Sequence, residues 1–188
     1  SASVQLAHEV IGSDFTFAKY EGSSSWYFPL LFKIVYSTRL RGAYLQQIGS
    51  VPPPYFERFF AGGLGSVRGY NSLSLTPTAI VCGDEEFQSD CSRRAEVALG
   101  GNKEAVFNNE LIFPLIPPAG LKWVVFYDVG NVFQESDFVN PRKLRQGWGF
   151  GIRWFSPIGP LRFEWGFPIR KRADEPTPVF EFFIGSLF

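Results

Sequence analysis

The stretch LRQGWGFGIRW, residues 144–154, decides the fold class, because its residues alternate in character at every step. One parity is mainly apolar and aromatic and consists of Leu144, Gln146, Trp148, Phe150, Ile152 and Trp154. The other parity is small or charged and consists of Arg145, Gly147, Gly149, Gly151 and Arg153. A period of two residues is that of a β-strand, whose successive side chains point to opposite faces of a sheet. The stretch therefore predicts a strand with one aromatic face and one face of glycine and arginine.

The same alternation recurs in two neighbouring segments, 121–133 and 161–168. In the second of these, Arg162, Glu164 and Gly166 alternate with large apolar residues, and the turn sequence SPIG precedes it. Eight strands are expected in all, at residues 4–11, 15–28, 31–45, 105–115, 121–133, 144–155, 161–168 and 179–188. The predicted fold is all-β and antiparallel, since all connections but one are short.

Alternation alone does not separate a soluble β-sandwich, which would bury the aromatic face, from a transmembrane barrel, which would present it to lipid. The chain has 188 residues, enough for one domain, and 18% of them are aromatic, which is high for a soluble domain. Glycine and arginine on the opposite face suit a water-filled or plugged lumen. The pattern favours an antiparallel transmembrane β-barrel.

Charge and residue chemistry exclude several classes of function. The 18 basic and 18 acidic residues cancel, so no nucleic-acid partner is expected. His8 is the only histidine, and no serine or cysteine nucleophile has a plausible histidine base. We therefore expect no enzymatic activity, no metal site and no cofactor.

One connection, residues 46–103, is far longer than an ordinary loop, and loops of this size are usually functional. It contains the sequence GGLGSVRGY, residues 62–70, in which one arginine stands among glycines. Gly62, Gly63, Gly65 and Gly69 permit backbone angles with positive φ and a close approach to another surface. From these residues alone, a second interpretation remains open, in which Arg68 lies in a solvated turn and binds no other part of the protein.

Six motifs follow one another along the chain: ERFFAGG (57–63), SVRGY (66–70), GGN (100–102), NEL (109–111), FYDVGNV (126–132) and SPIGPLR (156–162). Together they resemble the C-terminal part of the BamA family of outer-membrane protein assembly factors. That family belongs to a wider superfamily of assembly barrels and two-partner secretion pores. The match covers nearly the whole chain.

The resemblance implies that the long extracellular loop folds back into the barrel, where Arg68 meets Glu110 and Asp128 on the inner wall. The alternation of their strands independently places both carboxylates on the lumen side. The loop motif carried over from the family consists of Gly62, Gly63, Val67, Gly69 and Tyr70. The hypothesis is that Arg68 pins the loop and thereby fixes the shape of the barrel.

Cys82 and Cys91 lie in the same loop, after the arginine motif, where some members of the family carry a cysteine pair. A disulfide formed in an oxidising compartment is the interpretation that the resemblance implies. Two unpaired thiols remain the alternative.

The family has a sixteen-stranded barrel preceded by soluble periplasmic repeats, and residues 1–188 resemble its last eight strands. The repeats are absent from this sequence. The chain is expected to be either part of the wider barrel or a barrel that closes on itself with eight strands. An eight-stranded lumen is filled by its own side chains and leaves no room for a returning loop, which favours the wider barrel.

The function that the resemblance implies is the folding and insertion of other β-barrel proteins in the bacterial outer membrane, through a lateral seam between the first and last strands. The last strand, residues 179–188, supplies one side of that seam. The candidate seam residues on it are Phe180, Phe182, Gly185 and Phe188. Expected partners are nascent outer-membrane proteins, lipoproteins of the assembly complex, outer-membrane lipid, and the remaining strands and repeats of the parent chain. The rival functions are a secretion pore of the same superfamily and a soluble β-domain with a structural or adhesive role.

Overall fold

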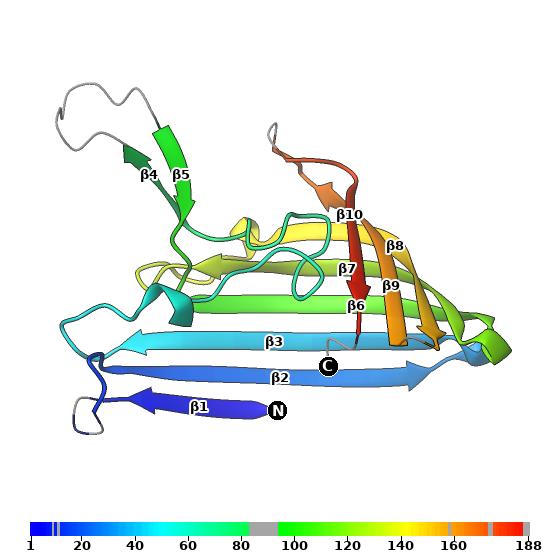
Figure 1. Cartoon of the computed structure of the whole chain (residues 1–188), viewed down its shortest axis with the longest axis horizontal. Helices are drawn as coiled ribbons and strands as arrows, with labels where there is room; N and C mark the ends of the chain where they lie inside the picture. The colour runs from blue at the N-terminus through cyan, green and yellow to red at the C-terminus, as the bar shows by residue number, and fades with distance from the viewer. Residues whose placement is uncertain (9, 11, 83–93, 158, 173–174, 186–188) are drawn as a thin grey trace.

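The computed structural model describes residues 1–8, 10, 12–82, 94–157, 159–172 and 175–185. Figure 1 shows its ten strands, which are β1 (Ala2–Ala7), β2 (Phe17–Pro29), β3 (Val35–Gln47), β4 (Thr78–Cys82), β5 (Arg94–Ala98), β6 (Lys103–Ile116), β7 (Leu121–Phe133), β8 (Arg145–Ser156), β9 (Gly159–Ile169) and β10 (Val179–Ile184). Short 3-10 turns occupy η2 (Leu31–Lys33), η3 (Tyr55–Glu57), η4 (Pro117–Ala119) and η5 (Pro141–Lys143). In the described part of the chain no helix is long and apolar enough to cross a lipid bilayer.

Eight of the strands form one antiparallel sheet in the order β1-β2-β3-β6-β7-β8-β9-β10. Each strand therefore pairs with its neighbour in sequence, except that β3 pairs with β6 across the long loop. Figure 1 shows the sheet curving from β2 round to β10, with the long loop on its concave side. Tight turns join the strands at one end of the sheet, whereas the long loop and the connections 134–144 and 170–178 lie at the other. This asymmetry is typical of outer-membrane barrels, whose periplasmic turns are short and whose extracellular loops are long.

The predicted all-β antiparallel fold is confirmed, with corrections at the strand ends. β3 begins at Val35, because Leu31–Lys33 form a turn in which Phe32 and Lys33 adopt positive φ angles of 58° and 59°. The apolar residues of this turn continue the strand pattern, so sequence alone extended the strand through it. β1 ends at Ala7, short of the predicted residue 11, and the long loop contains an additional hairpin, β4–β5.

The eight-stranded sheet is open. Within the described residues β1 pairs only with β2, and β10 pairs only with β9. Of the two alternatives drawn from the sequence, the self-closed eight-stranded barrel is therefore wrong, and the sheet has the form of part of a wider barrel wall. The concave face is wide enough for the long loop to return over it (Figure 1).

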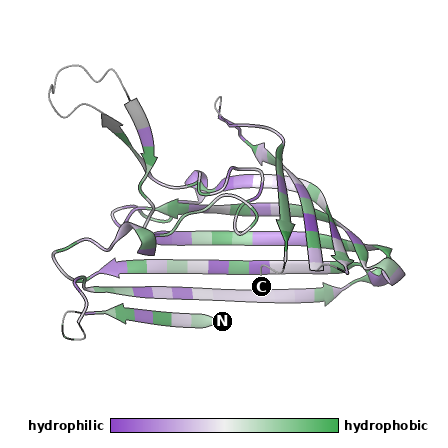
Figure 2. Ribbon diagram, viewed as in Figure 1, coloured by the Kyte–Doolittle hydropathy of each residue, from purple (hydrophilic) through white to green (hydrophobic). Residues whose placement is uncertain are grey.

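The convex face of the sheet carries the aromatic residues, and nothing among the described residues covers it. Trp148, Phe150 and Trp154 on β8 are 46%, 37% and 40% exposed, whereas Gly147, Gly149 and Gly151 between them are buried. Neighbouring rings pack across β8, β9 and β10, with centroid distances of 4.9 Å for Trp148–Phe167, 5.6 Å for Phe150–Trp165, 5.1 Å for Trp165–Phe180 and 4.9 Å for Phe163–Phe182. Figure 2 shows the matching alternation of hydropathy along β3. An uncovered aromatic face contradicts a soluble sandwich and fits a face turned to lipid.

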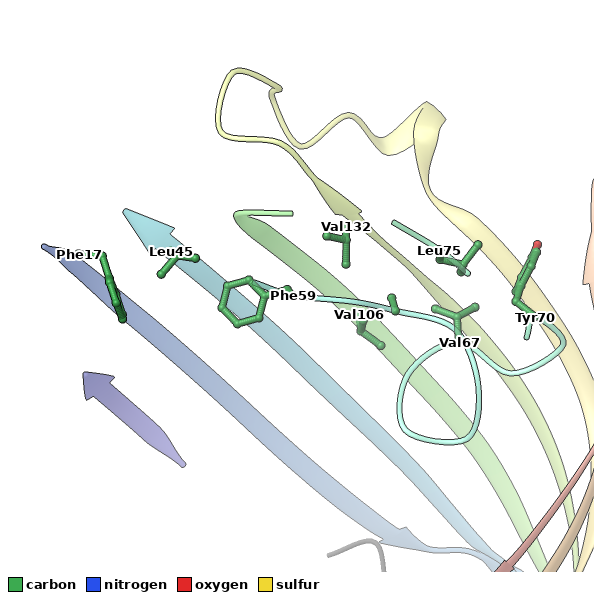
Figure 3. Close-up of a cluster of buried hydrophobic side chains, with 9 residues drawn as sticks. Phe17, Leu45, Phe59, Val67, Tyr70, Leu75, Val106 and Val132 are labelled. Atoms are coloured by element: carbon green, nitrogen blue, oxygen red, sulfur yellow. The ribbon is translucent and has the colours of Figure 1, made fainter. Parts of the chain in front are cut away.

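The buried apolar core lies between the long loop and the concave wall, as Figure 3 shows. The loop contributes Phe59, Ala61, Val67, Tyr70 and Leu75, and the wall contributes Phe17, Leu45, Val106 and Val132. Val67 and Ala61 are fully buried. The loop is thus packed against the wall and does not extend freely into solvent.

The exposed aromatic face makes a stability prediction. Phe150 lies midway along β8, so Phe150→Arg would place a charge near the middle of the bilayer and destabilise the barrel by about 2–4 kcal/mol. The shift in urea midpoint of the full-length protein refolded into lipid vesicles measures this. Phe138→Arg is the matched control, because Phe138 is 91% exposed in the connection between β7 and β8. An equal loss in both variants would contradict the assignment of this face to lipid.

Candidate functional site

Two isolated bridges and a tight turn fold the long loop. Phe59 pairs with Gly101, and Ala61 pairs with Leu75, so the loop doubles back on itself. Within the turn, the Gly62 N–H donates to Ser66 Oγ at 2.7 Å and the Gly63 N–H donates to the Val67 carbonyl at 3.1 Å. Gly62 and Gly63 adopt φ angles of 106° and 88°, which side chains disfavour. This turn places Arg68 against the inner wall.

Arg68 inserts into the wall and binds three carboxylates. Its Nε and Nη2 donate to Asp128 Oδ2 and Oδ1 at 2.6 and 2.8 Å, and its backbone N–H donates to Oδ2 at 3.1 Å. Its Nη1 donates to Glu110 Oε1 at 2.6 Å and to Glu164 Oε2 at 3.0 Å. These residues come from β7, β6 and β9, so one guanidinium joins the loop to three strands.

Two further arginines balance the charge of this cluster. Arg153 on β8 donates to Glu110 Oε2 at 2.8 Å and to Glu164 Oε1 at 2.8 Å. Arg162 on β9 donates to Glu164 Oε1 at 2.8 Å. Three guanidinium groups therefore face three carboxylates, and we call Arg68, Glu110, Asp128, Arg153, Arg162 and Glu164 the ion cluster. A buried charge is tolerated where it is paired and hydrogen-bonded, as each charge here is.

The centre of the cluster is buried. The side chains of Arg68, Asp128 and Glu164 are 3%, 0% and 1% exposed. The Arg68 guanidinium also stacks over the Phe126 ring at 3.7 Å from its centroid, a cation–π contact that strengthens when water is excluded. Burial by itself would lower the pKa of Arg68, but the Asp128, Glu110 and Glu164 carboxylates raise this pKa well above its usual value. Arg68 therefore stays charged in the fold.

Glycines of the wall leave room for the loop backbone. A Cβ atom added to Gly147 on β8 would lie 2.0 Å from the Arg68 carbonyl oxygen, and one added to Gly166 on β9 would lie 2.3 Å from the Gly69 nitrogen. On β7, a Cβ at Gly130 would lie 2.9 Å from the Val67 side chain. The inward glycines are thus the surface on which the loop rests.

The remaining motif residue, Tyr70, and the tip of the loop make two more contacts with the wall. The Tyr70 hydroxyl donates to the Gln146 carbonyl at 2.7 Å, and its side chain is buried. At the tip, the Leu64 N–H donates to Glu181 Oε1 on β10 at 3.0 Å. The loop therefore contacts every strand from β6 to β10.

The structure brings together Arg68, Glu110 and Asp128, the three residues singled out from the sequence, and adds three residues that sequence reasoning missed. Arg153, Arg162 and Glu164 were visible as inward charges in the alternation, but no motif linked them to Arg68. Phe180 and Phe182 lie exposed on β10, and Gly185 follows its end with a φ of 121°.

Two other predicted residues, Cys91 and Phe188, receive no structural assignment. Cys82 ends β4, but Cys91 lies outside the described residues, as does Phe188, so the disulfide and the terminal aromatic stay predictions. Across the described ranges no group of three or more histidine, cysteine, aspartate or glutamate side chains is arranged to hold a metal ion.

Comparison with known proteins decides the family, since the sequence model of the Omp85 superfamily domain matches residues 1–188. The chain belongs to the Omp85 superfamily. Among Omp85 relatives, it is 34% identical over 181 residues to the outer membrane protein assembly factor BamA of Nitratidesulfovibrio vulgaris, covering 95% of this chain and 21% of that protein. It is 30% identical to BamA of Neisseria meningitidis serogroup B, covering 72% of this chain and 19% of that protein.

Two further comparisons extend the Omp85 likeness. The chain is 30% identical to the chloroplastic outer envelope protein 80 of Arabidopsis thaliana, covering 69% of this chain and 15% of that protein. The crystal structure of BamA from Haemophilus ducreyi lacking POTRA domains 1–3 superposes with a TM-score of 0.77 at 29% identity, covering 91% of this chain and 35% of that chain. The chain spans about a fifth of the length of the BamA relatives it matches. Its sequence and fold are those of an Omp85 barrel of the bacterial outer membrane.

The glycine surface yields a prediction about the loop. Gly147→Ala adds a methyl group where the Arg68 carbonyl lies, so we expect the loop to be displaced and residues 48–77 to become sensitive to protease. Gly22→Ala is the matched control, because its added Cβ would have its nearest neighbour at 4.0 Å. Equal protease resistance of the wild type and both variants would show that the loop does not rest on β8.

The ion cluster yields a prediction about stability. Arg68→Ala leaves three carboxylates facing two arginines, and breaking a buried pair in this way costs about 3–5 kcal/mol. Adding Asp128→Asn removes the unpaired charge, so the double variant should regain part of the loss in its urea midpoint. Lys143→Ala is the control, because the exposed pair Lys143–Asp137 at 3.8 Å contributes less than about 1 kcal/mol. Additive losses in the double variant would contradict an electrostatic origin.

Proposed function

We propose that this chain forms the C-terminal part of an outer-membrane barrel that folds and inserts other β-barrel proteins. The observation that carries the proposal is the buried ion cluster that seats the VRGY loop inside the wall, in a chain 34% identical to a protein named as an assembly factor. The cluster holds the loop against the wall and does not take part in a chemical reaction. Each carboxylate is paired with at least one arginine. This pairing supports a role in fixing the shape of the barrel and not in acid–base catalysis.

Arg68 is proposed to pin the loop and hold β6, β7 and β9 in one arrangement. The last strand is then the movable part. In the described part of the chain, β10 pairs with β9 from Val179 to Ile184, and no strand pairs with its other edge. Such an edge templates the addition of a further strand, which is the physical basis for receiving an incoming substrate strand.

The loop is also connected to this edge. Glu181, on the inward side of β10, accepts the Leu64 N–H from the tip of the loop. Moving β10 away from the wall would break that bond. The proposed lateral seam and the pinned loop are therefore coupled through one hydrogen bond.

The open edges of the sheet support further proposals about the whole protein. In lipid each unpaired backbone group costs several kcal/mol, so β1 and β10 require additional strands of the parent chain beside them. Periplasmic repeats in the parent, nascent outer-membrane proteins as substrates, and assembly lipoproteins as partners are proposed on the likeness to BamA. The absence of enzymatic activity is proposed on the same basis.

A two-partner secretion pore is the competing function within the superfamily, and the two relatives named as assembly factors favour insertion over export. The separating experiment is to reconstitute the full-length protein in liposomes and supply an unfolded barrel substrate. We expect the substrate to become membrane-integrated and protease-resistant, and we expect Arg68→Ala to reduce this strongly while Lys143→Ala leaves it unchanged. Passage of an exported passenger across the membrane without integration would assign the protein to secretion.

A further inference from the structure

The tip of the long loop, residues 64–66, is bound from two opposite sides of the wall. On one side, Glu181 Oε1 on β10 accepts the Leu64 N–H at 3.0 Å. On the other side, Arg41 Nη1 on β3 donates to the Gly65 carbonyl at 3.3 Å. One cavity of about 570 Å³ is lined by Arg41 and Glu181 together with these tip residues. The two side chains therefore face the same space, one from β3 and one from β10.

The strands β3 and β10 are far apart along the sheet. Five strand pairings separate them in the order β3-β6-β7-β8-β9-β10. Neighbouring strands lie about 4.8 Å apart, so the path along the sheet from β3 to β10 is about 24 Å. Leu64 and Gly65 are consecutive residues, whose Cα atoms lie about 3.8 Å apart. Two long side chains and one pair of residues thus span the concave side of the curved sheet, as a chord spans an arc (Figure 1).

Glu104 on β6 holds the Arg41 side chain in position. Arg41 Nη2 pairs with Glu104 Oε1, while Nη1 of the same guanidinium reaches the Gly65 carbonyl. The Glu104 side chain is 6% exposed, so its charge requires a partner. A guanidinium is a planar fork, whose two Nη atoms donate in fixed directions. Glu104 therefore fixes the direction from which Arg41 meets the loop.

Asn108 on β6 connects the same tip to the ion cluster. Its Nδ2 donates to the Ser66 carbonyl at 2.5 Å and to Asp128 Oδ1 at 2.9 Å. Asp128 in turn binds the Arg68 guanidinium. The three tip residues therefore contact β10, β3 and β6 in turn. The tip cannot shift toward one of these strands without stretching its hydrogen bonds to the others.

We infer that the loop tip is a brace that sets the distance between β3 and β10, and that Arg41 and Glu104 are positioning residues for the last strand. Flattening the wall would lengthen the chord and break the Arg41–Gly65 or the Leu64–Glu181 hydrogen bond. The ion cluster consists of Arg68 and residues of β6 to β9, so the brace adds two strands that the cluster does not contain. The inference concerns the shape of the wall and holds whether the barrel inserts proteins or exports them.

The test is the distance between β3 and β10 in the full-length protein in lipid vesicles. Nitroxide labels at Leu40→Cys and Phe180→Cys, beside the two ends of the brace, report this distance by double electron–electron resonance. Both positions are about half exposed, at 51% and 53%. The background lacks all other cysteines, Cys82 and Cys91 among them. We expect one narrow distance distribution when the brace is intact.

Arg41→Lys and Glu181→Ala each cut one end of the brace. A lysine still pairs with Glu104 but lacks the forked second arm that donates to Gly65. The urea midpoint of Arg41→Lys should therefore stay near that of the wild type, while its distance distribution broadens. Glu181→Ala removes the acceptor of the Leu64 N–H and should broaden the distribution in the same way. Because both substitutions cut one chord, the double variant should broaden it no more than either single variant does.

Hydrogen exchange at the Leu64 amide is a second readout. In Arg41→Lys the acceptor of this amide is unchanged, but the tip has lost its anchor on the opposite side of the wall. We expect the amide to exchange about three- to tenfold faster, which corresponds to the loss of one hydrogen bond. If Arg41 served only as the partner of Glu104, neither the distance nor the exchange would change in this variant, and the inference would fail.

Three controls leave the brace intact. Gly65→Ala keeps the carbonyl, and its added Cβ meets no atom within 4 Å. Glu181→Gln keeps an acceptor oxygen for the Leu64 N–H. Arg142→Lys makes the same exchange of side chains at an exposed position in η5. All three should match the wild type in both readouts.

Three results would overturn the brace. They are an unchanged distance distribution in both end variants, additive broadening in the double variant, and equal broadening in the η5 control. None of these measurements includes a substrate. A failure of the brace is therefore told apart from a failure of the proposed insertion activity.

Discussion

Arg68 brings one positive charge into a part of the wall where three carboxylates converge, and neither side of this contact is stable without the other. Taking an ion out of water costs several kcal/mol even after the protein relaxes, and only close pairing with hydrogen bonds offsets that cost. Asp128 and Glu164 are almost completely buried, so the wall carries charges that require the loop. The loop in turn carries a guanidinium that requires the wall. Because each side requires the other, the long loop is held in one position on the wall.

Shape and charge act together in this arrangement. The inward glycines of β7, β8 and β9 let the loop backbone approach the wall, which brings the Arg68 side chain within bonding distance of Asp128. The apolar residues around Val67 and Tyr70 exclude water from the same region. Removal of water strengthens each ion pair, because the local dielectric constant falls. The aromatic residues on the opposite face have a different role, since they meet lipid and leave the interior to polar groups.

Much of this was readable in the sequence, for physical reasons. The period of two in residues 144–154 fixes which side chains face lipid, and the structure follows it from Trp148 to Trp154. The same parity rule placed Glu110 and Asp128 on the inner face. It did not reveal that Glu164 joins them, because the partner of an inward charge depends on strand order and on the path of the loop. The turn at Leu31–Lys33 was misread because its residues are as apolar as those of a strand.

Hydrogen exchange at the Arg68 amide tests the pinned loop most directly. This N–H donates to Asp128 Oδ2 in the buried interior of the ion cluster, so its exchange reports whether the loop stays seated. In the full-length protein in lipid, we expect the amide to exchange as slowly as those in the middle of β7. Exchange as fast as that of residues 134–140, in an extracellular connection, would mean that the loop leaves the wall freely and that Arg68 does not hold it.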